Sequence, residues 1–164
     1  MKQRMEYWNI APGAYKAMLS LETYLRGCGL DKSLLHMVKL RASQINGCAY
    51  CIDMHWKDAR AAGETEQRLY GLDAWREAPY YTDRERAALA WTEALTSITK
   101  PAAGSDGSIH ASHVPDSLYD AVRAHFSEKE FADLTWVIAA INTWNRIAIA
   151  FRAQAGTYKP ASHS

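Results

Sequence analysis

The sequence predicts an all-α fold in one compact domain. Apolar residues recur at intervals of three and four along the 164 residues, which is the spacing of a helix face. No segment shows the sustained alternation of apolar and polar residues that is typical of a half-buried strand. The length suits a single domain and suffices to bury a core without disulfide bonds. We therefore expect about six to eight helices in one domain over residues 1–164.

Glycines mark the ends of the first expected helices. Residues 15–25 have helical apolar spacing and end at Gly27-Cys28-Gly29, which suits a helix C-terminus. A second helix is expected from about residue 33 to residue 45, where Asn46-Gly47 interrupts it. The next expected helix begins close to this interruption, so Cys48 should lie in its first turn.

The helix that follows is expected over residues 48–62, because Gly63 is a typical stop. A further helix through residues 69–75 must end before Pro79, which lacks the amide hydrogen that a helix interior needs. Thr82 with Glu85 forms a capping box and predicts a helix that runs to about Leu95.

The remaining chain predicts a connection and then a C-terminal helical part. Residues 100–115 are rich in Pro, Gly, Ser and Ala and indicate an exposed loop. Residues 116–153 contain a short helix and, after a second capping box at Ser127 and Glu130, a long helix toward Phe151. Its stretch 136–141 is apolar nearly all round, which is typical of a helix in the core or between subunits.

Composition excludes several classes of function. The formal net charge is +1 and the basic residues are dispersed, so no nucleic-acid surface is expected. No apolar run is long enough to predict a membrane span. The first ten residues lack the apolar stretch and cleavage site of a secretory signal, and we therefore expect a cytoplasmic protein. Three cysteines, two of them three residues apart, favour metal or redox use over an extracellular disulfide framework.

Reactive side chains cluster in residues 41–55, RASQINGCAYCIDMH. On a helix Cys48 and Cys51 are three residues apart and Cys51 and His55 are four apart, so all three share one face. An imidazolium nearby and a position in the first helical turn both favour the thiolate, which is the nucleophile. Cys51 is then the expected attacking thiol. Cys48 is placed to condense with the sulfenic acid that a peroxide forms on Cys51.

Other interpretations of the two thiols remain open. A haem attachment site is disfavoured, because its histidine would directly follow the second cysteine. Zinc would have three soft ligands in Cys48, Cys51 and His55, with Cys28 or His36 as a possible fourth. Inert buried thiols are the third alternative, since free cysteine often serves as a small core residue.

The segment Cys-x-x-Cys-x-x-x-His after Asn-Gly resembles the carboxymuconolactone decarboxylase superfamily, and specifically its alkylhydroperoxidase D-like (AhpD-like) branch. The similarity covers residues 34–95, and residues 141–146, INTWNR, also look like this branch. The resemblance implies an AhpD-like helical fold and a homo-oligomer, a trimer or hexamer. It also implies a peroxidase that reduces organic hydroperoxides with electrons from a dithiol or thioredoxin-like partner and requires no cofactor.

The resemblance also assigns roles to individual residues. It makes Cys51 the peroxidatic cysteine, Cys48 the resolving one, and His55 part of a proton relay. The family usually has a glutamate twelve residues before the first cysteine, whereas this chain has His36 there. A second imidazole accepts a proton only in its neutral form, so the relay should be altered. Glu85 and Glu93 are candidate replacements for the missing carboxylate.

Two further functions stay open beside the peroxidase and the zinc-binding module. The missing glutamate and the long apolar helix are compatible with a non-catalytic, redox-sensing oligomer. The resemblance also leaves a decarboxylase-like enzyme as an alternative, although decarboxylase members lack the cysteine pair.

Overall fold

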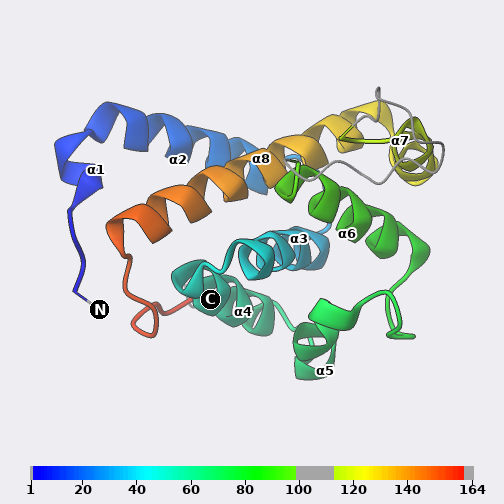
Figure 1. Ribbon diagram of the computed structural model, residues 1–164, viewed down its shortest axis with the longest axis horizontal. Helices are drawn as coiled ribbons and strands as arrows, with labels where there is room; N and C mark the ends of the chain where they lie inside the picture. The colour runs from blue at the N-terminus through cyan, green and yellow to red at the C-terminus, as the bar shows by residue number, and fades with distance from the viewer. Residues whose placement is uncertain (1, 99–112, 161–164) are drawn as a thin grey trace.

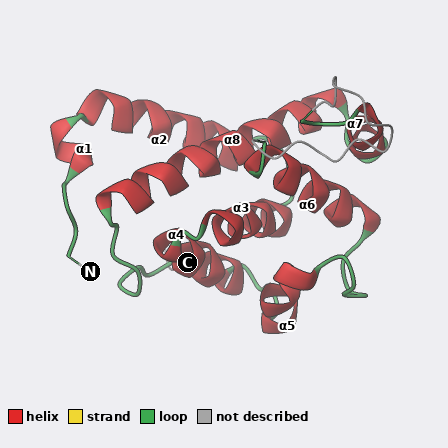
Figure 2. Cartoon of the chain, viewed as in Figure 1, coloured by secondary structure: helices red, strands yellow, loops and turns green. Residues whose placement is uncertain are grey.

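The computed structural model describes residues 2–98 and 113–160, and these residues form helices and loops without any strand (Figure 2). The prediction of an all-α fold is confirmed. The elements, in chain order, are α1 (Tyr7–Ile10), α2 (Pro12–Arg26), α3 (Lys32–Asn46), α4 (Ala49–Ala61), α5 (Glu66–Tyr70), a 3₁₀ helix η1 (Gly71–Ala74), α6 (Asp83–Thr96), α7 (Asp116–Arg123) and α8 (Glu128–Phe151).

Helix ends follow the capping signals of the sequence. Thr82 and Ser127 each accept a hydrogen bond from the backbone three residues on, and the glutamates there bond back to the cap residue. Both predicted capping boxes are therefore confirmed. The α3 helix has a further cap, because the Asp31 side chain accepts a hydrogen bond from the Leu34 amide.

Two local features differ from the expected pattern, and a third is not tested. The short helix α1 was not predicted, because four residues are too few for apolar periodicity to be recognised. The helix expected over residues 69–75 is divided into α5 and η1, with Gly71 at the junction. Most of the expected loop, residues 99–112, lies outside the described residues.

A Cβ atom at Gly71 would lie 1.9 Å from the hydroxyl oxygen of Tyr80. Only glycine therefore fits at this junction without a shift of the tyrosine ring.

Helix α3 lies at the centre of the fold and packs against α4, α6 and α8 (Figure 1). Met37, Val38 and Leu40 on this helix have no exposed surface. The long helix α8 also buries most of its middle, including Leu134 and Ile138. The sequence predicts its apolar stretch either in the core or between subunits, and most of it lies in the core. The Trp136 side chain, by contrast, is 57% exposed.

None of the described helices combines the length and the apolar character that a membrane crossing requires.

A candidate thiol redox site

Cys48 and Cys51 lie at the start of α4, against α3 and α8. Cys48 is the N-cap residue of α4 and Cys51 lies in its first turn. Each has only 1% of its surface exposed, and both are free thiols. Their Sγ atoms are 2.6 Å apart, so a proton on one sulfur is hydrogen-bonded to the other. The pair is already close enough to form a disulfide without backbone movement.

The turn between α3 and α4 places the two thiols. Gly47 has a φ of 69°, in the left-handed region that glycine adopts without strain. The Cys48 amide then donates to the Ser43 carbonyl at 3.0 Å, which closes the end of α3. The Asn-Gly pair in the sequence therefore ends one helix and begins the next at the first cysteine.

The two thiols have very different pKa values because they share a proton. The hydrogen bond from Cys51 lowers the pKa of Cys48 to about 7, and backbone amides at the start of α4 contribute in the same direction. The same hydrogen bond, together with burial, raises the pKa of Cys51. When the pair loses its first proton near neutral pH, the negative charge therefore lies on Cys48. The Cys51 thiol stabilises this charge by donating a hydrogen bond to it.

Buried amides of α8 and α3 support the thiol pair. Asn145 is fully buried, and its carboxamide donates to the Ser43 hydroxyl at 3.1 Å and accepts from Asn46 at 2.9 Å. It also hydrogen-bonds the sulfurs and lowers the pKa of both. Asn142 accepts from Asn46 and donates to the Thr96 hydroxyl. These amides have the partners that polar groups in an apolar helix require.

A cavity of about 570 Å³ opens beside the first cysteine. Cys48 and Tyr50 line it from α4, while Arg152 and Gln154 line it from the segment after α8. Cys51 is not among the lining residues. A molecule in this cavity therefore meets Cys48 before it meets Cys51.

His55 makes no hydrogen bond to the thiols, unlike the relay that the sequence predicts. It lies on α4 with 6% of its surface exposed, and neither ring nitrogen has a hydrogen-bond partner among the described residues. Its ring instead lies 6.3 Å from the ring of His36 on α3, measured between centroids. One ring nitrogen of each histidine and one carboxylate oxygen of Asp58 lie within 4.8 Å of one another. The histidine thus joins a second polar cluster, one turn beyond the sulfurs.

Burial also changes the expected charge of His55. Desolvation lowers its pKa well below the ordinary range, and the charges of Lys39 and His36 act in the same direction. The imidazole is therefore neutral at physiological pH. The prediction of an imidazolium that stabilises the Cys51 thiolate is therefore wrong, because burial removes the hydration that a cation at this position would need.

The remaining candidate residues have other partners. Glu93 accepts hydrogen bonds from Arg41 and Trp75, and Glu85 belongs to a capping box and pairs with Arg68. Neither lies in the histidine cluster, where Asp58 is the carboxylate. The sequence contained a signal for Asp58, because a residue three positions after His55 on a helix lies on the same face. The predicted zinc ligands also do not assemble, since the cluster within the described residues contains no cysteine.

Comparison with known proteins identifies the family. The sequence pattern of the carboxymuconolactone decarboxylase family matches residues 12–94, which is half of the chain. The chain belongs to this family. The uncharacterised protein YdfG of Bacillus subtilis is 43% identical over 157 residues, which cover 96% of this chain and 99% of YdfG.

Solved structures of other proteins show the same fold. A protein of unknown function from Agrobacterium tumefaciens, suggested to be the antioxidant defence protein AhpD, is 44% identical with a TM-score of 0.84. The match covers 96% of this chain and all of that one. A peroxidase-related AhpD core protein from Ralstonia eutropha, 19% identical, has a TM-score of 0.73 over 92% of this chain and 74% of its own. The predicted AhpD-like fold is thus confirmed.

Proposed function

We propose that the protein is a thiol-dependent peroxidase that reduces organic hydroperoxides through a Cys48–Cys51 disulfide. The observation that carries the proposal is the pair of free, buried sulfurs 2.6 Å apart at the start of α4. Whichever sulfur is oxidised, the second thiol already lies beside it and can form the disulfide. The AhpD and peroxidase-related descriptions of structural relatives point to the same chemistry.

The proposed cycle begins when the shared proton moves to Cys48 and leaves the anion on Cys51. The Cys51 thiolate attacks the outer oxygen of the hydroperoxide, the O–O bond breaks, and the departing alkoxide takes a proton from solvent and leaves as the alcohol. Cys51 is then a sulfenic acid. The Cys48 thiol attacks it, water leaves, and a disulfide forms, so two electrons have passed from the two sulfurs to the peroxide.

An external dithiol, or a thioredoxin-like protein, returns the two electrons. We propose that it attacks the disulfide at Cys48, which is the sulfur that lines the cavity. Cys51 is then the leaving thiolate and is regenerated in its attacking form. The second thiol of the reductant attacks the mixed disulfide, Cys48 leaves, and the reductant departs as its own disulfide. The proposed partners are therefore an organic hydroperoxide and a dithiol, and the proposed assembly is a homo-oligomer.

The test is hydroperoxide consumption with a dithiol reductant, measured for the native chain and for Cys51→Ser, Cys48→Ser and Cys28→Ser. Cys28 is the matched control because it is the third free cysteine and lies away from the pair. We expect both pair variants to lose turnover and Cys28→Ser to keep it. Equal rates for native chain and Cys51→Ser would refute the peroxidase.

The order of attack has its own readout, the trapping of sulfenic acid with dimedone. In Cys48→Ser the adduct should form on Cys51, because no thiol remains to resolve it. An adduct on Cys48 in Cys51→Ser, with none on Cys51 in Cys48→Ser, would reverse the two roles while leaving the disulfide chemistry in place.

A further inference from the structure

We propose that His36, His55 and Asp58 form a binding site for one divalent transition metal ion of the zinc type, separate from the thiol pair. The three residues come from two packed helices, His36 from α3 and the other two from α4. Two imidazoles and one carboxylate form a ligand set that suits zinc, cobalt or iron in their divalent states.

The distances between the ligand atoms fit an ion after a small adjustment. One atom from each side chain lies within 4.8 Å of the others. Ligand atoms bound tetrahedrally to zinc at about 2.1 Å lie roughly 3.4 Å apart. The three ligand atoms would therefore have to approach one another by at most about 1.4 Å to bind one ion.

The burial of His55 is a second and independent indication. A buried imidazole normally has a hydrogen-bond partner on at least one ring nitrogen, because an unsatisfied polar group costs free energy. Both nitrogens of His55 lack one among the described residues, although the side chain is 94% buried. A metal ion in the cluster would satisfy one of these nitrogens.

The surroundings hold Asp58 in place and limit competing charge. The Tyr158 hydroxyl donates to Oδ1 of Asp58 at 2.7 Å and leaves the carboxylate with further lone pairs for an ion. An outer partner of this kind orients a ligating carboxylate. Lys39, the lysine whose charge acts on His55, is itself ion-paired with Glu22 at 2.6 Å.

Three protein ligands leave a fourth tetrahedral position for water or another small ligand, as in zinc sites that are not purely structural. The site would also occupy His55, the residue that the family resemblance places in the proton relay. Bound metal and relay function are therefore expected to exclude each other. Metal binding itself depends on neither thiol, so it can be tested apart from the peroxidase.

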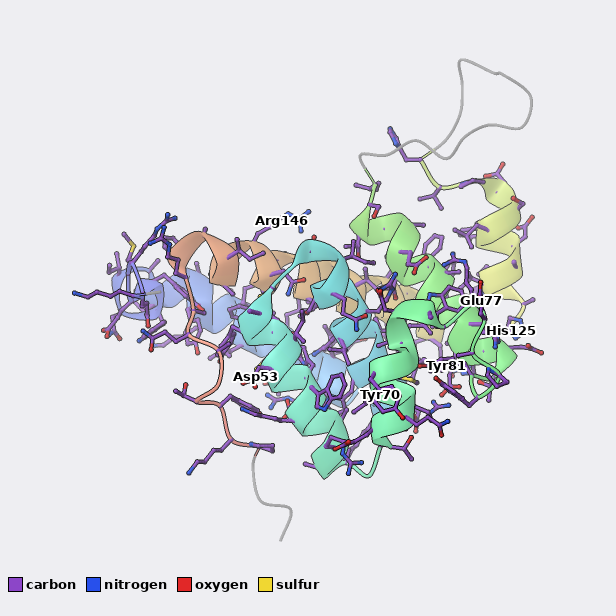
Figure 3. The ribbon with its side chains drawn as sticks, turned by 60° about the horizontal axis from the view of Figure 1, so that its bottom comes forward. Asp53, Tyr70, Glu77, Tyr81, His125 and Arg146 are labelled. Carbon is purple, nitrogen blue, oxygen red and sulfur yellow. The ribbon has the colours of Figure 1, made fainter. Side chains whose placement is uncertain are left out.

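The experiment is a titration of the full-length, metal-free chain with Co²⁺, followed by visible absorption, and with Zn²⁺, followed by metal analysis after dialysis. It uses the native chain, a Cys48→Ser/Cys51→Ser double variant, Asp58→Asn, His36→Gln and Asp53→Asn. Asp53, which Figure 3 labels, is the matched control, because it is another carboxylate of α4. Like Asp58, it binds the C-terminal segment, by accepting a hydrogen bond from the Gly156 amide.

We expect about one metal ion per chain for the native protein, the double cysteine variant and Asp53→Asn. Asp58→Asn and His36→Gln should each weaken binding by at least about tenfold, a loss typical when the ligand environment is disturbed. Far-UV circular dichroism shows whether each variant is folded. One folded variant of the two, Asp58→Asn or His36→Gln, is sufficient to test the proposal. The proposal is overturned if the native chain binds no metal, if either folded single variant binds metal normally, or if binding disappears with the thiols.

Discussion

At the scale of single residues, a shared proton between two sulfurs decides which thiol is acidic. Cys48 has a pKa of about 7 because Cys51 donates to it, and burial alone would have the opposite effect. The cysteine spacing predicted the pair and its position at a helix start. It did not predict this polarity, because the nearest expected cation, His55, is buried and neutral.

The acidity of Cys48 should therefore depend on the hydrogen atom of Cys51. In the native chain, alkylation of Cys48 by iodoacetamide should rise with pH to half its maximum near pH 7, because the thiolate reacts. In Cys51→Ala the pKa should rise toward that of an ordinary thiol, about 8.5. Peptide mapping by mass spectrometry separates Cys48 from Cys28.

Cys51→Ser is the control for this prediction, since a hydroxyl can still donate to the thiolate. Its Cys48 pKa should lie between those of the native chain and Cys51→Ala. An unchanged pKa in Cys51→Ala would mean that the helix start and Asn145 suffice to acidify the thiol.

At the scale of elements, the junction of α3 and α4 positions the site. The Asn-Gly signal predicted this junction, and each expected helix end beside it lies within one residue of the observed end. Asp58 and the cavity after α8 were harder to predict. A single sequence does not show which face of α4 meets α3, and it gives no sign that Arg152 comes to lie beside Cys48.

Gly47→Ala should destabilise the protein by about 1 kcal/mol, because a Cβ atom disfavours the left-handed backbone found there. No atom lies within 4 Å of the added Cβ, so the cost comes from backbone strain alone. Gly13→Ala is the matched control, since its Cβ also meets nothing within 4 Å but lies inside α2. Urea unfolding should show a loss for the first variant and none for the second.

At the scale of the whole molecule, partly buried ion pairs link the helices around α3. Arg41 of α3 donates to Glu93 of α6, which also accepts from Trp75 and Arg76. The all-α class and the order of the helices were predictable from periodicity. This convergence of distant residues on one carboxylate was not, because it depends on how α6 packs against α3 and the chain after η1.

Glu93 should stabilise the fold at neutral pH and lose this effect in acid. Burial alone would raise its pKa, but hydrogen bonds from Trp75, Arg76 and Arg41 outweigh it, and the pKa is lowered from about 4.5. A carboxylate with a lowered pKa in the folded state stabilises above its unfolded pKa and loses the contribution as pH falls through its folded pKa. The loss should therefore begin below about pH 4.5.

Glu93→Gln should lower the free energy of unfolding at pH 7 by about 1 to 3 kcal/mol, since it leaves the buried Trp75 indole N–H and the partly buried Arg41 guanidinium poorly paired. The native and variant stabilities should converge in acid. Glu128→Gln is the control, because its carboxylate side chain is 92% exposed and should contribute little. Equal losses for the two variants in urea unfolding would contradict a structural role for Glu93.

The central claim is that Cys48 and Cys51 form a redox pair, and one single-turnover measurement tests it most directly. The reduced chain, freed of reductant, receives one equivalent of an organic hydroperoxide, and its thiols are then counted and mapped by mass spectrometry. We predict the loss of two thiols per peroxide, one intramolecular Cys48–Cys51 disulfide, and an unmodified Cys28. A chain that keeps all three thiols, or that loses Cys28 while the pair stays reduced, would contradict the claim.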